Sequence, residues 1–393
     1  MLQAISKDGK RVTLAMLPRS TLLQLRNSST PFYCPVCKQK VIMKIGNKVI
    51  PHFAHQRKEE CPSSEAGEGL YHEEGKLLLY QWLRRQGLNV QLEMYIPDIK
   101  QRPDLLLHFP DRKIAIEFQC SKIPKDEINA RTEGYLQMGI VPFWILGLTR
   151  MRQLSPYVWK IDAFTRQLIH QYTPASPLTI TYFCPLKKQF LQIHYLTFSQ
   201  MNRAIGKMER IPLEYGRFRD LFSVPLFPKE SFLQVWYKEK LRFRTKRREN
   251  LYGNELIWRQ WLYSQGVYLE QLPSIVHLPV RSQFLLKVPP WNWQSRLYFK
   301  VLEKCQVGNS FSLRQCERIL RPYFYSADTF PLISKKDNPI EQYLRYWEKL
   351  HIVEKRSPEI YVKLKEIPLY TTLEEAIQGD RMLIKKLIRL QLT

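Results

Sequence analysis

The chain has 393 residues, of which 44% are hydrophobic, so it can bury a sizeable core and is not intrinsically disordered. It holds 61 Lys and Arg against 36 Asp and Glu, a formal net charge of +25 that favours a polyanionic partner, usually nucleic acid. An anionic membrane surface is an alternative that rests on net charge alone. No apolar run is long enough to span a membrane and the N-terminus has no apolar signal core, so we expect a cytoplasmic protein.

Residues 1–66 are expected to form a small β-rich region with a zinc-knuckle-like site. The short alternating segments before residue 34 predict strands joined by turns. A hairpin is expected after the first cysteine pair, with Gly46 and Asn47 as its turn.

Cysteine and histidine spacing in this region indicates a structural metal site. Cys34 and Cys37 form a C-x2-C pair, and the later candidates are His52, His55 and Cys61. Four of these five side chains complete a tetrahedral Zn²⁺ site. We favour His55 and Cys61, because this choice leaves the segment around His52 free to pack. The alternative is a reduced cysteine pair in a turn with surface histidines, and a redox pair is disfavoured because no thioredoxin-like unit surrounds it.

Residues 67–150 are expected to form a compact α/β unit. An apolar stripe predicts a helix over 70–85 that ends at Gly87, and strands are expected over 89–96 and on either side of a turn at Pro110-Asp111. A second helix is expected over 125–138 and a buried strand over 140–147. The order helix, three strands, helix, strand predicts a central mixed sheet.

Acidic side chains occupy positions in this sheet where apolar residues are usual. Glu117 and Gln119 are two apart in a strand and share a face, and the hairpin turn places Asp104 beside them. Two carboxylates in a basic protein are a donor set for Mg²⁺ or Mn²⁺, which bind phosphate oxygens and activate water. The alternative is that these acids lie at a solvated sheet edge or pair with a nearby Arg or Lys.

The remaining chain divides into a connecting region and a helical domain. Residues 151–228 are expected to hold a hairpin over 179–198, and residues 229–393 repeat a helical period. Residues 238–248 carry a dense basic run around Phe243, which suits a phosphate backbone and stacked single-stranded bases, although a solvated helix face is the common alternative. The residues expected to bind DNA there, with little sequence specificity, are Lys240, Arg242, Arg244, Lys246, Arg247 and Arg248.

The motifs RPDLLL and IAIEFQ, within the helix and strand order given above, resemble the PD-(D/E)xK nuclease superfamily, whose core is αβββαβ. Together with FYCPVC, PHFAH, YHEEGK and EFQCSKI, in this order, they resemble the CoiA-like competence proteins over residues 1 to about 150. The resemblance implies that Asp104 and Glu117 are the two metal-binding acids. Gln119 stands where most of the superfamily has Lys, and this departure weakens the expectation of catalysis because an amide carries no positive charge.

Two helices are expected to add to the site. Glu68, His72 and Lys76 lie on one helix face, and the resemblance implies that Glu68 adds a metal ligand and that Lys76 contacts a phosphate. The alternative is an exposed stripe with i, i+4 ion pairing. Arg131 and Tyr135 resemble the polar-x-x-x-Tyr element of related nucleases and are expected to bind DNA, with an ordinary half-buried helix face as the alternative.

Two functions follow from these observations. The first is a Mg²⁺- or Mn²⁺-dependent DNA nuclease that acts on DNA taken up during transformation, with a link to a RecA-type recombinase; the competence role and the recombinase are implied by the resemblance. The second is a non-catalytic DNA-binding accessory factor that keeps a nuclease-like fold to assist such a recombinase.

Overall fold

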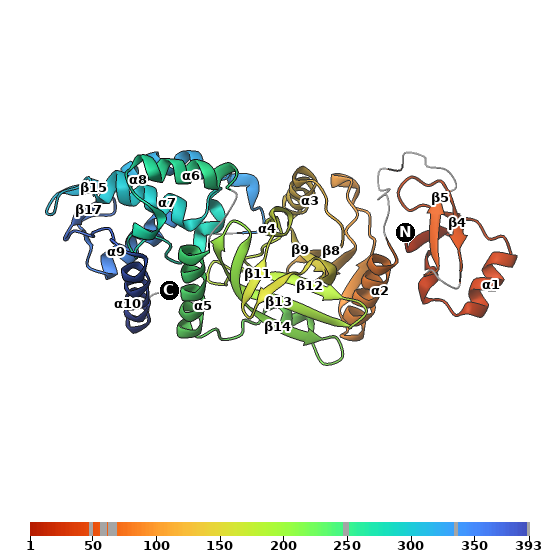
Figure 1. Ribbon diagram of the computed structural model, residues 1–393. Helices are drawn as coiled ribbons and strands as arrows, with labels where there is room; N and C mark the ends of the chain where they lie inside the picture. The colour runs from red at the N-terminus through yellow and green to blue at the C-terminus, as the bar shows by residue number, and fades with distance from the viewer. Residues whose placement is uncertain (47–49, 56–60, 62–68, 247–250, 334–336, 391–393) are drawn as a thin grey trace. The chain divides into compact units, whose positions relative to one another are not determined.

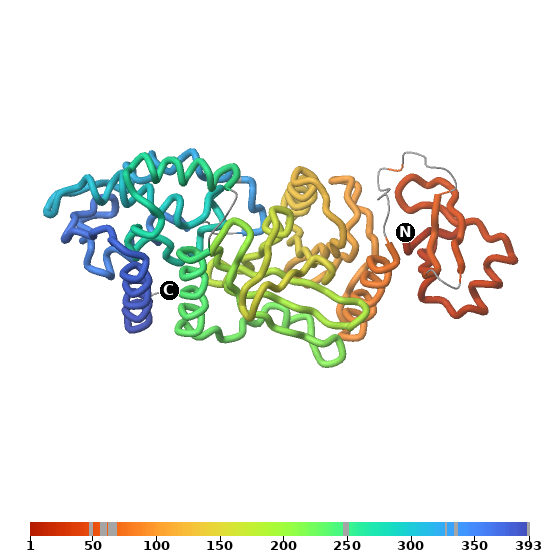
Figure 2. The backbone as a smooth tube through the Cα atoms, viewed as in Figure 1, coloured from red at the N-terminus to blue at the C-terminus, as the bar shows by residue number. Residues whose placement is uncertain are grey.

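The structure is a computed structural model that describes residues 1–46, 50–55, 61, 69–246, 251–333 and 337–390. The chain forms two compact units. Unit 1 comprises Met1–Met151, Ile180–Gln192 and Glu209–Ser223, and unit 2 comprises Arg152–Thr179, Ile193–Met208 and Val224–Thr393. Figure 1 shows the helices and strands, and Figure 2 shows the course of the backbone. None of the helices in the described ranges is both long and apolar enough to cross a bilayer.

The N-terminal part of unit 1 is a five-stranded antiparallel sheet in the order β2-β1-β3-β4-β5. Its strands are β1 (Gln3–Ser6), β2 (Arg11–Thr13), β3 (Phe32–Tyr33), β4 (Lys40–Lys44) and β5 (His52–His55). The expected hairpin is confirmed in the pairing of β4 with β5, whereas Asn47 of its turn lies outside the described residues. The small core of this sheet comprises Ala4, Leu14, Leu22, Phe32, Val41 and Phe53.

The expectation of strands alone before residue 34 is wrong, because α1 spans Arg19–Asn27 and a short 3-10 turn, η1, spans Leu14–Met16. Pro18 precedes α1 with a φ of −56°, a value that suits a helix start. Leu22 and Leu25 are three residues apart, so both turn toward the sheet core from one helix face. Both η1 and α1 are short, and α1 is mostly polar, which explains why the periodicity of apolar residues did not predict them.

The α/β part of unit 1 confirms the expected order of elements. It comprises α2 (Leu70–Arg85), β6 (Asn89–Leu92), β7 (Leu105–His108), β8 (Lys113–Gln119), α3 (Lys125–Gln137) and β9 (Ile140–Gly147). Strands β6, β7 and β8 pair antiparallel, β9 runs parallel to β8, and β12 (Ile180–Cys184) runs parallel to β9. Within unit 1 the strand order is β14-β13-β12-β9-β8-β7-β6, so the sheet is mixed.

Helices α2 and α3 cover opposite faces of β8. The ring of Phe118 stacks on His72 of α2 at 5.6 Å between centroids, whereas Glu117 bonds to Tyr135 of α3. Adjacent strand residues point to opposite faces, so the two helices enclose β8 between them. Gly75 allows this close approach, because a Cβ there would lie 2.0 Å from the Phe118 ring.

Unit 2 combines strands with a mostly helical region after residue 229, as expected. Its strand order is β10-β11-β14-β13, and a separate three-stranded sheet has the order β15-β17-β16. The hairpin expected over 179–198 is confirmed, because β12 and β13 are neighbours in the sheet. Along the chain, β13 passes from unit 1 into unit 2 and β14 passes from unit 2 back into unit 1. The strands are β10 (Gln153–Ser155), β11 (Val158–Lys160), β13 (Gln189–Gln200), β14 (Arg203–Pro212), β15 (Ser310–Ser312), β16 (Val353–Lys355) and β17 (Ile360–Lys363).

The helices of unit 2 pack around a large aromatic core that includes Trp236, Trp258, Trp293 and Trp347. They are α4 (Ala163–Gln167), α5 (Lys229–Thr245), α6 (Gly253–Ser264), α7 (Pro290–Leu297), α8 (Leu313–Leu320), α9 (Pro339–Lys349) and α10 (Leu373–Arg389).

Short 3-10 or π turns lie in both units, namely η2 (Pro97–Ile99), η3 (Leu148–Arg150), η4 (Phe218–Phe222), η5 (Leu269–Gln271), η6 (Arg281–Leu285), η7 (Tyr298–Leu302), η8 (Arg321–Tyr323) and η9 (Ala327–Thr329).

A buried histidine makes the stability of unit 2 sensitive to acid. His277 is fully buried, its Nε2 lies 3.0 Å from the carbonyl oxygen of Ser199, and burial, reinforced by the nearby Lys240 ammonium, lowers its pKa to about 3. As the pH falls below 6.5, the imidazole of His277 becomes protonated in the unfolded chain but stays neutral in the folded chain. The free energy of unfolding therefore decreases by about 1.4 kcal/mol per pH unit.

We expect His277→Gln to reduce the pH dependence of unfolding between pH 6.5 and 4 by about that slope, measured by urea denaturation at each pH. Only the difference between wild type and variant in the slope of unfolding free energy against pH tests the role of His277, because the substitution also changes packing and so shifts stability at every pH. An unchanged slope would show that the buried imidazole does not titrate as described.

Candidate functional site

The two predicted acids meet across β7 and β8. The pairing of Leu105 with Ile116 places Asp104, just before β7, opposite Glu117 of β8. The Oδ2 atom of Asp104 accepts a hydrogen bond of 2.7 Å from the backbone N–H of Phe118. Asp104 is 6% exposed and Glu117 is 2% exposed, so both acids are buried.

Glu117 is held by two side chains of α3. Arg131 donates from Nη2 to Oε2 at 2.5 Å, and the Tyr135 hydroxyl donates a short hydrogen bond to Oε1. The Arg131 guanidinium also lies over the Trp144 ring, 5.6 Å from its centroid. Burial raises the pKa of Glu117; Arg131 opposes this shift and the neighbouring Asp104 adds to it. The predicted Arg131 and Tyr135 face therefore points at the second acid.

Lys76 of α2 lies among three carboxylates. Its Nζ atom is 2.8 Å from Glu93 Oε1, 3.5 Å from Glu73 Oε1 and 3.7 Å from Asp104 Oδ1. His72, one turn earlier, places Nε2 3.3 Å from Asp104 Oδ2. Lys76 has no exposed surface, so its charge balances buried acids and does not meet solvent in this conformation.

Glu93 belongs to this buried cluster, although the sequence interpretation did not single it out. Its Oε2 atom accepts a 2.9 Å hydrogen bond from the backbone N–H of Leu2 and lies 3.6 Å from Nη1 of Arg102. It follows β6 directly and has a positive φ of 48°, so the strand ends there. An acid that follows a half-buried strand is the signal that could have pointed to it.

One predicted residue, Gln119, is not brought into the cluster. The Gln119 amide nitrogen donates to the backbone oxygen of Ser121 at 2.9 Å and lies 3.4 Å from its hydroxyl. Gln119 does share the strand face of Glu117, two residues earlier, but its amide is turned to the loop that follows β8. Glu68 lies outside the described residues.

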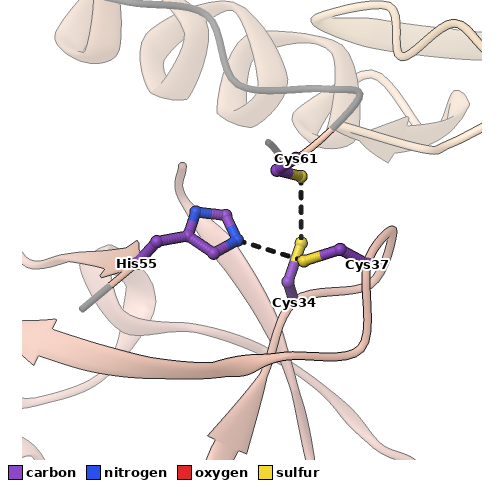
Figure 3. A group of neighbouring side chains, drawn as sticks. All are labelled: Cys34, Cys37, His55 and Cys61. Carbon is purple, nitrogen blue, oxygen red and sulfur yellow. Dashed lines mark hydrogen bonds between the residues drawn. The ribbon is translucent and has the colours of Figure 1, made fainter. Parts of the chain in front are cut away.

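The N-terminal sheet brings together Cys34, Cys37, His55 and Cys61 (Figure 3). Their ligand atoms all lie within 4.8 Å of one another; Cys34 Sγ is 3.9 Å from Cys61 Sγ, and Cys37 Sγ is 3.3 Å from His55 Nε2. The structure thus favours the set that includes His55, and the Nδ1 atom of His52 instead lies 2.8 Å from the backbone oxygen of Ile50. Burial raises the pKa of the Cys34 thiol to about 11, an effect that a bound cation would oppose.

The predicted basic face of α5 is divided between the core and the surface. Lys240 and Arg244 are buried, and their charged groups lie 3.3 Å and 2.8 Å from the carboxylate of Asp380. The expectation that these two residues bind DNA does not fit this placement, because each already neutralises a buried acid. Arg242 and Lys246 are exposed, and Arg247 and Arg248 lie outside the described residues.

The architecture and the comparisons agree on the class of protein. Residues 68–225, which contain the mixed sheet and the buried acidic cluster, match a nuclease-like domain model. That model describes the nuclease-like domain of competence protein CoiA, and models of the N-terminal and C-terminal domains of the same protein match residues 14–64 and 232–377. The chain belongs to the CoiA-like family of competence proteins, as its motifs indicated.

A curated relative supports this assignment along most of the chain. The competence protein CoiA of Bacillus subtilis (strain 168) is 28% identical over 356 residues, which covers 89% of this chain and 94% of the relative. No protein of solved structure matches the chain.

Proposed function

We propose that this competence protein is a metal-dependent DNA nuclease that processes DNA taken up during transformation. The observation that carries the proposal is the position of Asp104 opposite Glu117 on neighbouring strands of a nuclease-like domain. The order α2, β6, β7, β8, α3, β9 supports a PD-(D/E)xK core, in which two acids at this point of the sheet bind a divalent metal.

The donor set fits Mg²⁺ or Mn²⁺, because two carboxylates supply hard oxygen ligands side by side. When bound, the metal neutralises the scissile phosphate and lowers the pKa of the attacking water. Gln119 is proposed to orient the attacking water and Glu68 to add a ligand. Lys76 and His72 position Asp104 from α2, so we assign Lys76 to the support of the acid and no longer to a phosphate contact.

A second function has its own support in the state described here. Arg131 bonds to Glu117 at 2.5 Å and Lys76 lies between Asp104 and Glu93, so protein cations balance both acids. Gln119 also lacks the charge of the usual Lys. These features favour a DNA-binding accessory factor that assists a RecA-type recombinase without cutting DNA.

We propose that the cluster of Cys34, Cys37, His55 and Cys61 binds a structural Zn²⁺. A tetrahedral site with Zn–S bonds of ~2.3 Å has edges of ~3.8 Å between sulfurs. The 3.9 Å between Cys34 Sγ and Cys61 Sγ fits this geometry. Four protein ligands leave no open position, so this metal stabilises the fold and takes no part in catalysis.

A cleavage assay separates the two functions. Single-stranded, duplex and branched DNA are incubated with the protein in Mg²⁺, in Mn²⁺ and without either ion. We expect metal-dependent cleavage that falls by more than about 100-fold in Asp104→Asn and in Glu117→Gln, since loss of even an outer-shell partner of a metal costs 10- to 100-fold. The matched control is Asp111→Asn, which removes an exposed acid from the turn of the same hairpin.

DNA binding by both variants must persist, and their thermal unfolding must stay cooperative, for the loss of cleavage to be assigned to the site. Wild-type protein that binds DNA tightly in low salt but never cuts it with either metal would contradict the nuclease. That result would support the accessory factor.

A further inference from the structure

A second candidate site lies in unit 2. It is a pocket of about 240 Å³. Its walls come from β10, from the end of β11, from the turn between β13 and β14, and from helices α5, α6 and α7. All of its lining residues belong to unit 2, so the pocket is formed within one compact unit.

The lining is strongly basic. One carboxylate, that of Glu255, faces five cations, which are Lys160, Arg203, Arg242, Lys246 and Arg259. Because like charges repel when they are gathered in one concave surface, this arrangement favours a bound anion.

Three of the five cations have no side-chain partner in the part of the chain that the structure describes. Arg203 forms two hydrogen bonds with Glu239, at 2.9 and 2.7 Å, and Arg259 lies 3.4 Å from Glu255. Among the described residues, Lys160, Arg242 and Lys246 form no side-chain hydrogen bond or ion pair, and all three are exposed. They are therefore available to a phosphate, unlike Lys240 and Arg244 on the buried side of the same helix.

The floor of the pocket is aromatic and carries an unused donor. The rings of Phe243 and Trp291 stack with their centroids 4.8 Å apart and their planes 24° from parallel. Within the described ranges the buried Nε1–H of Trp291 has no acceptor. The side-chain amides of Gln200 and Asn202 add further polar groups at the hairpin turn.

We propose that this pocket binds a nucleotide unit of single-stranded DNA. The phosphates contact Lys160, Arg242 and Lys246, and the base lies toward Phe243 and Trp291. An unpaired base of a single strand can enter a pocket of this size, whereas the bases of a duplex are paired and stacked inside the helix. Among the described residues, the three cations without a partner come from β11, from α5 and from the residue directly after α5, and several such cations suit the successive phosphates of a strand.

The test is fluorescence anisotropy with a labelled oligothymidylate, in buffer without Mg²⁺ or Mn²⁺, with gels to verify intact DNA. The variant carries Lys160→Gln, Arg242→Gln and Lys246→Gln. The matched control carries Lys300→Gln, Lys304→Gln and Arg318→Gln, which removes the same charge from exposed positions of unit 2 outside the pocket. We expect at least about a 10-fold loss of affinity in the variant, and a salt dependence reduced by about 2 in the slope of log K against log salt.

Equal affinity and equal salt slope in the variant and the control would overturn the proposal. So would tighter binding of a duplex of the same length, or competition by micromolar thymidine monophosphate, which would make the pocket a mononucleotide site. Because no divalent metal is added, a failure of the nuclease proposal leaves this measurement unaffected, and the reverse also holds.

Discussion

Cys34→Ser is expected to release the metal from the N-terminal sheet and to unfold that sheet. The four candidate ligands come from the residue after β3, the turn that follows, β5 and Cys61, so a bound ion would tie together segments that otherwise share only a small core. Structural Zn²⁺ contributes about 10–16 kcal/mol to the folding of small zinc domains, which are unfolded without it. Loss of one of four ligands should therefore remove most of the stability of residues 1–55.

The measurement is the zinc content of the purified protein together with hydrogen exchange of β1 to β5. We expect one equivalent in the wild type, much less in Cys34→Ser, and fast exchange confined to the N-terminal sheet. Cys305→Ser, a change to a half-buried cysteine in unit 2, is the control and should keep the full equivalent. A wild-type protein that folds with no bound metal would contradict the assignment.

Lys76→Met should be the most destabilising single change in the acidic cluster. It leaves Glu73, Glu93 and Asp104 close together without the cation that lies between them. Removing one partner of a buried ion pair costs about 3–5 kcal/mol, because the remaining charge is neither solvated nor balanced. The free energy of unfolding in urea gives the value, and Lys113→Met, at an exposed position of β8, should change it by less than about 0.5 kcal/mol.

The double variant Lys76→Met with Glu93→Gln distinguishes loss of charge balance from loss of packing. Removing one acid along with the cation lowers the repulsion, so the double variant should be more stable than Lys76→Met alone. A Lys76→Met protein within 1 kcal/mol of the wild type would show that the cluster is not organised around this ammonium.

Local patterns predicted much of unit 1. The apolar stripe over 70–85 predicted α2 with its observed bounds, because helix periodicity depends only on neighbours three and four residues apart. The turn at Pro110-Asp111 predicted the register that sets Asp104 opposite Glu117, because a short hairpin leaves few alternatives. Cysteine and histidine spacing likewise indicated the cluster around Cys34.

The same reasoning could not find partners that lie far apart in the chain. Asp380 is 136 residues from Arg244, and its carboxylate decides that half of the basic face of α5 turns inward. Lys76 was expected to contact phosphate, and Glu93, 17 residues later, instead draws it into the interior. In each case the pattern of charged residues predicted a polar helix face. It did not predict which of these charged side chains would be buried.

The sequence alone therefore determined the order of elements, the closeness of the two acids in neighbouring strands and the candidates for the cysteine–histidine cluster, because these depend on spacing within one or two elements. The structure then distinguished His55 from His52. Only the tertiary structure decided which charges are balanced internally and which remain for a ligand. That distinction separates Lys240 and Arg244 from Arg242 and Lys246 on one helix, because burial requires a charge to have a partner and the partner comes from distant sequence.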